Sequence, residues 1–191
     1  MGHGVIPVQD VVPTGQTPIV TIALIVINAM VFAAQLIPVP LPPALPFAHP
    51  DVVHFLTALL FLWIFGDHVE ARLGRVTLLL LYLVSSVAAT YAASIFAPFL
   101  SPSQTAAAFA VTGVLGAYFL LLPQSRVLML VPAPGLLTEL PAWFLAAMWA
   151  LLQIAGFART PRSLPALMAS LIMAFAIGAL TALLARRPIR W

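Results

Sequence analysis

Long apolar stretches alternate along this chain with short segments that hold most of its charged residues. A membrane-crossing segment needs about 20 mainly apolar residues, and it must be helical because backbone groups in lipid need partners within their own segment. The second stretch is short unless it continues through His68 to Glu70. The pattern therefore predicts an all-α, polytopic membrane protein with six transmembrane helices, at residues 18–37, 52–67, 76–96, 101–122, 138–157 and 164–185.

Composition supports this prediction. Of the 191 residues, 63% are hydrophobic and 7% are charged, whereas a soluble domain carries roughly 25% charged residues. This excludes a water-soluble globule, a disordered tail and a coiled coil. The chain has no Cys, which excludes a disulfide framework and a thiolate nucleophile. Its basic residues are eight arginines, too few for a nucleic-acid footprint, so the first partner we expect is the lipid bilayer.

The arginines predict the orientation, because positive charge concentrates on the cytoplasmic side. With the N-terminus inside, six arginines fall on the inner side and only Arg159 and Arg162 fall outside. We therefore expect an N-terminal cytoplasmic segment over residues 1–17, one membrane domain over 18–185 and a basic cytoplasmic tail over 186–191. The use of Arg in place of Lys, with abundant Ala and Pro, indicates a GC-rich bacterium, so the expected location is a bacterial inner membrane, either plasma or intracytoplasmic.

Two ordered motifs carry a family resemblance. Residues 61–75 read FLWIFGDHVEARLGR, and residues 113–118 read GVLGAY, with Pro123 following. Together with residues 25–32 and 142–153, these stretches resemble the rhomboid family of intramembrane serine proteases over residues 17–185. The resemblance implies a six-helix bundle that hydrolyses a peptide bond within the membrane. It also implies a serine nucleophile near the start of the fourth helix, a histidine base on the sixth, and a His-xxx-Asn pair on the second that holds the oxyanion.

The residues at those family positions cannot perform that chemistry. Counted from the motifs, the serine position holds Ala108, the histidine position holds Leu171, and the asparagine position holds Ala58, while His54 is retained. Losing either the serine or the base of a triad costs on the order of a million-fold in turnover. We therefore expect no enzyme activity, no catalytic residues, no metal and no cofactor. A shifted dyad of Ser103 with His49 or His54 is the alternative that would restore catalysis.

The former site is also expected to be closed. The family's flanking glycines are replaced by Ala106 and Phe109, and alanine is the strongest helix former. The fourth helix should therefore begin near a Ser101 cap, and Phe109 should fill part of the family's cavity.

Small residues recur at helical spacing on the fourth and sixth spans. Such faces let helix backbones approach closely in lipid, so we expect these two helices to pack directly against each other. The alternative is that the pattern reflects an alanine-rich composition. The residues are Gly113, Gly116, Ala117, Ser170, Ala174 and Gly178.

Polar residues are few, and most have structural interpretations. Asn28 and Gln153 are expected to form hydrogen bonds between helices. His54 could ligate a heme or chlorophyll, but the simpler interpretation is a neutral side chain bonded to a neighbouring backbone group. The four histidines lack metal-site spacing. An inner-loop charge cluster, expected to pair charges and cap helix ends, consists of Asp67, Glu70, Arg72 and Arg75.

Three functional hypotheses remain. The leading one is a rhomboid-like pseudoprotease that binds the transmembrane helices of partner or client membrane proteins. The first alternative is a structural accessory subunit of a respiratory or photosynthetic membrane complex, in contact with pigments or quinones. The second is an active protease, if the motif alignment is wrong.

Overall fold

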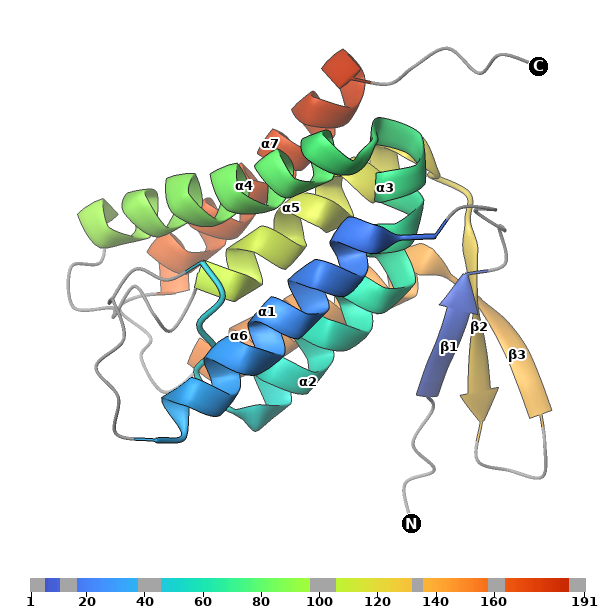
Figure 1. The fold of residues 1–191 in the computed structure, drawn as a ribbon, viewed down its shortest axis with the longest axis horizontal. Coiled ribbons are helices and arrows are strands. Elements are labelled where there is room, and N and C mark those ends of the chain that lie inside the picture. The colour runs from blue at the N-terminus through green and yellow to red at the C-terminus, as the bar shows by residue number, and fades with distance from the viewer. Residues whose placement is uncertain are drawn as a thin grey trace.

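The computed structural model describes residues 6–10, 17–37, 46–96, 106–131, 136–157 and 164–185 (Figure 1). A five-residue π-helical turn, Leu62–Gly66, joins α2 to α3 without a break. The seven α-helical segments of these ranges therefore form six rods, which confirms the predicted six-helix, all-α membrane bundle. The segments are α1 (Ile19–Gln35), α2 (Val52–Phe61), α3 (Asp67–Leu73), α4 (Arg75–Phe96), α5 (Ala106–Leu121), α6 (Ala142–Phe157) and α7 (Leu164–Ala185).

Three of the described helices are long and apolar enough to cross a membrane by themselves: Val52–Leu73, Arg75–Ile95 and Leu164–Ala185. The other three rods are shorter apolar helices. The second span therefore continues beyond the expected boundary at residue 67 and ends at Gly74. The Gly74 N–H donates to the carbonyl of Glu70 (2.8 Å), and its φ of 89° is one that glycine adopts readily.

A small antiparallel sheet at one end of the bundle was not predicted (Figure 1). Its order is β1 (Ile6–Asp10), β2 (Arg126–Val131), β3 (Leu136–Pro141). Asp10 pairs with Val127, and Val127 pairs with Leu140. The predicted start of the fifth span at residue 138 is wrong, because residues 138–141 belong to β3 and α6 begins only after Pro141.

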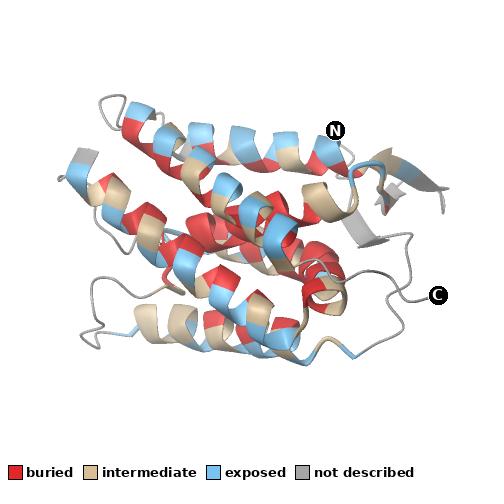
Figure 2. Cartoon of the chain, turned by 90° about the horizontal axis from the view of Figure 1, so that it is seen from above, coloured by how far each residue is buried: buried red, intermediate tan, exposed pale blue. Residues whose placement is uncertain are grey.

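Helix α5 lies at the centre of the bundle. All of its residues from Ala106 to Tyr118 are buried, as expected for a helix that is apolar on every side. Figure 2 shows the buried residues on inward faces and the exposed ones around the outside. Helices α4 and α7 pack closely on α5, while the rod of α2 and α3 and helix α6 contact it elsewhere. The predicted start of the fourth helix at Ser101 lies outside the described residues, as do residues 186–191.

Candidate functional site

One buried stripe of α2 carries the retained histidine. His54, Ala58, Phe61 and Phe65 follow one another at helical spacing, and all are buried. Asp51 caps the helix, since its carboxylate accepts from the backbone N–H of His54 (2.9 Å) and lies 2.8 Å from the Nδ1 of the same residue. His54 therefore bonds to a side chain and not to a backbone group as expected. The sequence signal for this cap, an Asp directly before the helix, was missed.

The hydrogen bonds at this helix end determine the protonation pattern. Burial acts to raise the pKa of Asp51, but the hydrogen bonds from His54 outweigh it and leave that pKa below its ordinary value. An ionised carboxylate only accepts, so the Nδ1 of His54 carries the proton. The second ring nitrogen, Nε2, points away from Asp51 and takes no part in this contact. This Nε2 is buried and has no hydrogen-bond partner among the described residues.

The position expected for the nucleophile holds a methyl group inside the bundle. Ala108 is 7% exposed and lies in the same apolar cluster as Ala58. Its carbonyl accepts a hydrogen bond from the Thr112 hydroxyl (2.7 Å), which in turn accepts from the Trp149 indole N–H (3.0 Å). The Thr112 hydroxyl therefore already has two hydrogen-bond partners, the Ala108 carbonyl and the Trp149 indole.

The position expected for the base is also apolar. Leu171 is 8% exposed and belongs to a second cluster with Phe109, Leu167 and Ala174. Phe109 is completely buried, so it occupies space between α5 and α7. The expectation that Phe109 fills part of the family's cavity stays a prediction. Ser103 lies outside the described residues, and the other histidine of the shifted dyad, His49, directs its Nε2 at Asn28 Oδ1 (2.9 Å).

The contacts between helices place several of these residues in one layer. Helices α5 and α6 are antiparallel, because they are joined at the sheet, where the Ala142 N–H donates to the Ser125 carbonyl (3.0 Å). Trp149 of α6 bonds to Thr112 of α5, and its ring lies 4.9 Å from that of Phe61 on α2. One helical turn farther from the sheet on each helix are Ala58, Ala108 and Gln153.

Gln153 differs from its expected role. It is completely buried, yet neither its Oε1 nor its Nε2 has a hydrogen-bond partner in the described structure, so the predicted interhelical bond is wrong. The matching prediction for Asn28 is confirmed. Asn28 Oδ1 accepts from the Tyr82 hydroxyl of α4 (3.0 Å) and from His49, which lies in the segment before α2.

The small residues of α5 and α7 lie against one another. A Cβ built on Gly178 would be 1.8 Å from the carbonyl oxygen of Gly113 and 2.8 Å from the backbone N of Ala117. A Cβ on Gly116 would be 2.1 Å from the carbonyl oxygen of Phe175. Ala174 and Ser170, one and two turns before Gly178, are completely buried, and the Ala174 carbonyl would lie 3.5 Å from a Cβ on Gly113.

The inner-loop charge cluster caps a distant helix. Glu70 is 5% exposed, and its carboxylate accepts from the backbone N–H groups of Val20 (3.1 Å) and Thr21 (2.8 Å) and from the Thr21 hydroxyl (2.9 Å). It therefore caps the first turn of α1. Asp67 lies 2.5 Å from the Nδ1 of His68, Arg72 is in the last turn of α3, and Arg75 Nε is 3.6 Å from Glu70.

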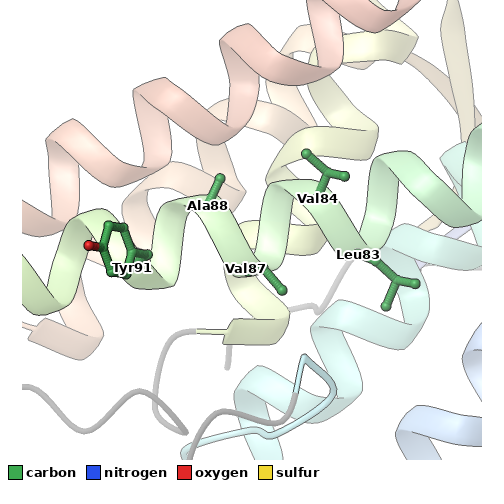
Figure 3. Close-up of a pocket in the computed structure, with 5 residues that line it drawn as sticks. All are labelled: Leu83, Val84, Val87, Ala88 and Tyr91. Atoms are coloured by element: carbon green, nitrogen blue, oxygen red, sulfur yellow. The ribbon is translucent and has the colours of Figure 1, made fainter.

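Other sites for a ligand are few. Across the described ranges, no three His, Asp or Glu side chains gather closely enough to hold a metal ion. A shallow hollow of about 390 Å³ lies on α4, lined by Leu83, Val84, Val87, Ala88 and Tyr91 (Figure 3). It is on the opposite face of α4 from Ser85 and Ser86, which face α5.

The comparisons with known proteins agree with the motifs. The rhomboid domain family matches residues 44–188, which is more than half of the chain. No curated protein and no solved structure matches. The match covers the helices from α2 to α7 and every residue of the layer around Ala108, while α1 lies before it. This multi-pass membrane protein therefore belongs to the rhomboid family of intramembrane serine proteases.

Proposed function

We propose that this chain is a rhomboid pseudoprotease that works by binding transmembrane helices of partner or client membrane proteins. The observation that carries the proposal is the layer around Ala108. A methyl group and an isobutyl group stand where the resemblance places the nucleophile and the base, and both lie in apolar clusters. Peptide hydrolysis needs an activated nucleophile within hydrogen-bond reach of a base, and neither Ala108 nor Leu171 can take part in that step.

Binding of helices fits what remains. A rhomboid bundle without its dyad still has large apolar outer faces in the bilayer, where helices associate through packing and hydrogen bonds. On α1, α4 and α7, several isoleucine, valine and leucine side chains are more than one-third exposed. Examples are Val26, Leu80 and Leu184.

Purification of the full chain in mild detergent, followed by quantitative mass spectrometry, tests this proposal. We expect one or more integral membrane proteins to co-purify in proportion to the chain and to be absent from a mock purification. Cleavage of a co-purified or added transmembrane protein, blocked by a serine-directed fluorophosphonate, would overturn it. A constant visible absorption in the purified complex would instead support the accessory-subunit hypothesis.

A further inference from the structure

One residue holds the segment that leads into α2, at the end of the bundle opposite the sheet (Figure 1). The His49 N–H donates to Gln35 Oε1 (3.1 Å), and Gln35 Nε2 donates to the His49 carbonyl (3.0 Å). The His49 ring directs its Nε2 at Asn28 Oδ1 (2.9 Å). No other residue of 46–50 forms a hydrogen bond to another described element. His49 therefore carries the polar attachment of this segment to α1.

The hydrogen bonds of Asn28 determine which nitrogen of His49 carries the proton. Asn28 Nδ2 donates to the Leu24 carbonyl (2.7 Å), so Oδ1 is the atom that accepts, both from the Tyr82 hydroxyl (3.0 Å) and from His49. Burial lowers the pKa of His49 to about 4, so the ring is neutral at neutral pH. Its proton is therefore on Nε2, and a second proton would have to enter at Nδ1.

The surroundings of His49 suit a neutral ring and not a cation. The residue is 3% exposed. Its ring makes edge-to-face contacts with the rings of Phe32 on α1 (6.1 Å) and Phe55 on α2 (5.4 Å). Among the described residues, Nδ1 has no hydrogen-bond partner. An imidazolium here would be desolvated without a new acceptor for its proton, which is costly.

The titratable groups around His49 do not offset that cost. Helix α1 has none, α2 contributes His54, and α4 contributes the Tyr82 hydroxyl. The carboxylate of Asp51 is already engaged by the backbone N–H and the Nδ1 of His54. Asp51 favours a charged His49, but desolvation and His54 outweigh it. A protonated His49 is therefore solvated best by leaving its place.

The rest of the segment is attached weakly enough to follow. Pro46 and Pro50 have no backbone N–H to donate. Phe47 stacks on the ring of Tyr82 (5.5 Å), and Ala48 is 3% exposed. Without His49, these apolar contacts are what remains between residues 46–50 and the described helices.

We propose that residues 46–51 form an acid-released latch, which is closed on α1 while His49 is neutral and lifts away when its ring is protonated. Release removes His49 from Asn28 and Phe47 from Tyr82, so a polar pair between α1 and α4 becomes accessible. The latch goes beyond the proposed function and does not depend on it, because it needs no partner.

Linkage gives the size and direction of the effect. The pKa of His49 is about 4 in the closed latch and returns to its ordinary 6.5 when the ring reaches water. A depressed pKa means that closure is complete above about pH 6.5 and is lost as the pH falls toward 4. The ratio of open to closed molecules should therefore rise about 20-fold between pH 7.5 and pH 5.

Hydrogen exchange of the full chain in phosphatidylcholine bilayers tests the latch. Protection of the His49 N–H, which Gln35 accepts, is measured at pH 7.5 and pH 5 and corrected for the pH dependence of intrinsic exchange. We expect about 20-fold lower protection at pH 5 in the peptide that contains residues 46–51. Peptides of α5 and α7 should keep their protection, which distinguishes local release from unfolding.

Three variants identify the sensor. His49→Gln retains an N–H donor but does not titrate, so the acid response should disappear. Gln35→Leu removes two hydrogen bonds of the latch without removing a titratable group, so exchange should be faster at both pH values while their ratio is kept. His54→Gln is the matched histidine control and should keep the acid response. Thermal unfolding confirms that each variant is folded.

Three results would overturn the latch. They are equal protection of residues 46–51 at the two pH values, an acid response that persists in His49→Gln, and an equal loss of protection in α5 and α7 at pH 5. None of them bears on helix binding, which the co-purification experiment tests separately.

Discussion

The two sides of α5 are held by different physical means. Against α7, backbones meet with no room for a methyl group, as at Gly178, and against α4 the Ser85 side chain fills the space beside Gly113. Against α2 and α6, contact is made by rings and by one hydrogen bond from Trp149 to Thr112, and Gln153 is left unpaired. Helix α1 is likewise attached to the rest of the bundle by individual hydrogen bonds, such as those from Val20 and Thr21 to Glu70. One side therefore fixes the fold by shape, while the other depends on individual polar groups, of which the Gln153 amide is left unpaired.

The largest effect should come from adding one methyl group on the shape-fixed side. In Gly178→Ala the new Cβ meets the Gly113 carbonyl at 1.8 Å, so α5 and α7 must separate. We expect a loss of about 4 kcal/mol or more in the free energy of unfolding, at the upper end of overpacking effects. Denaturant unfolding in micelles measures it. Ala176→Val, on an exposed position of α7, is the control, and equal stability of the two variants would contradict the account.

The next effect should come from removing a polar link. Glu70→Ala deprives two backbone N–H groups and one hydroxyl of α1 of their acceptor. We expect a loss of about 3 kcal/mol, the scale of a buried charged hydrogen-bond acceptor. Faster hydrogen exchange at Val20 and Thr21 checks the location. Glu139→Gln removes an exposed carboxylate 3.8 Å from Arg126 and should change stability by less than about 0.5 kcal/mol. A similar loss in both variants would refute the capping role.

The pH dependence of stability tests a second polar link. Burial, reinforced by His54 and opposed by Asp51, lowers the pKa of His49 from 6.5 to about 4. The unfolded chain then binds more protons between these values, so stability is complete above about pH 6.5 and is lost as the pH falls toward 4. We expect a decrease of about 3 kcal/mol from this residue, since each unit of pKa difference corresponds to about 1.4 kcal/mol. His49→Gln should flatten the curve, and an unchanged pH profile in that variant would exclude His49 as its source.

The smallest expected effect is an increase in the free energy of unfolding. Gln153→Met replaces an unpaired buried amide with a thioether of similar length, so the free energy of unfolding should increase by about 1 kcal/mol. Asn28→Leu, which removes the acceptor of Tyr82 and His49, should decrease it. Thermal unfolding of the Gln153→Met and Asn28→Leu variants measures both changes. Destabilisation by Gln153→Met as well would mean that the Gln153 amide has hydrogen-bond partners.

Much of the fold was predictable because each segment that crosses a lipid bilayer must be a helix of about 20 mainly apolar residues. Stretches of nearly uniform apolar character identified all six rods, and the continuation of the second span through His68 to Glu70 was left open. The sheet was not predictable in the same way. It joins Ile6–Asp10 to Arg126–Val131 across more than a hundred residues, and its short strands lack a distinct alternation.

The sequence predicted the helix contact of the candidate site better than its polar chemistry. Small-residue spacing indicated which helices approach at Gly178, while the assignment of Ala108 and Leu171 to the catalytic positions rests on motif spacing and stays a prediction. Pairing of Gln153 depends on which residues of α2 and α5 stand at the same level, and that follows from helix packing, not from local sequence. Asp51 could have been recognised, since an Asp before Val52 is an N-cap signal.

The intact mass of the full chain after exposure to a serine-directed fluorophosphonate in bilayers tests the central claim most directly. On the proposal that Ala108 and Leu171 stand at the positions of the dyad, we predict an unmodified mass under conditions that label an active rhomboid protease to completion. A stoichiometric phosphonyl adduct on any serine of the chain, lost when His54 is replaced, would contradict the account.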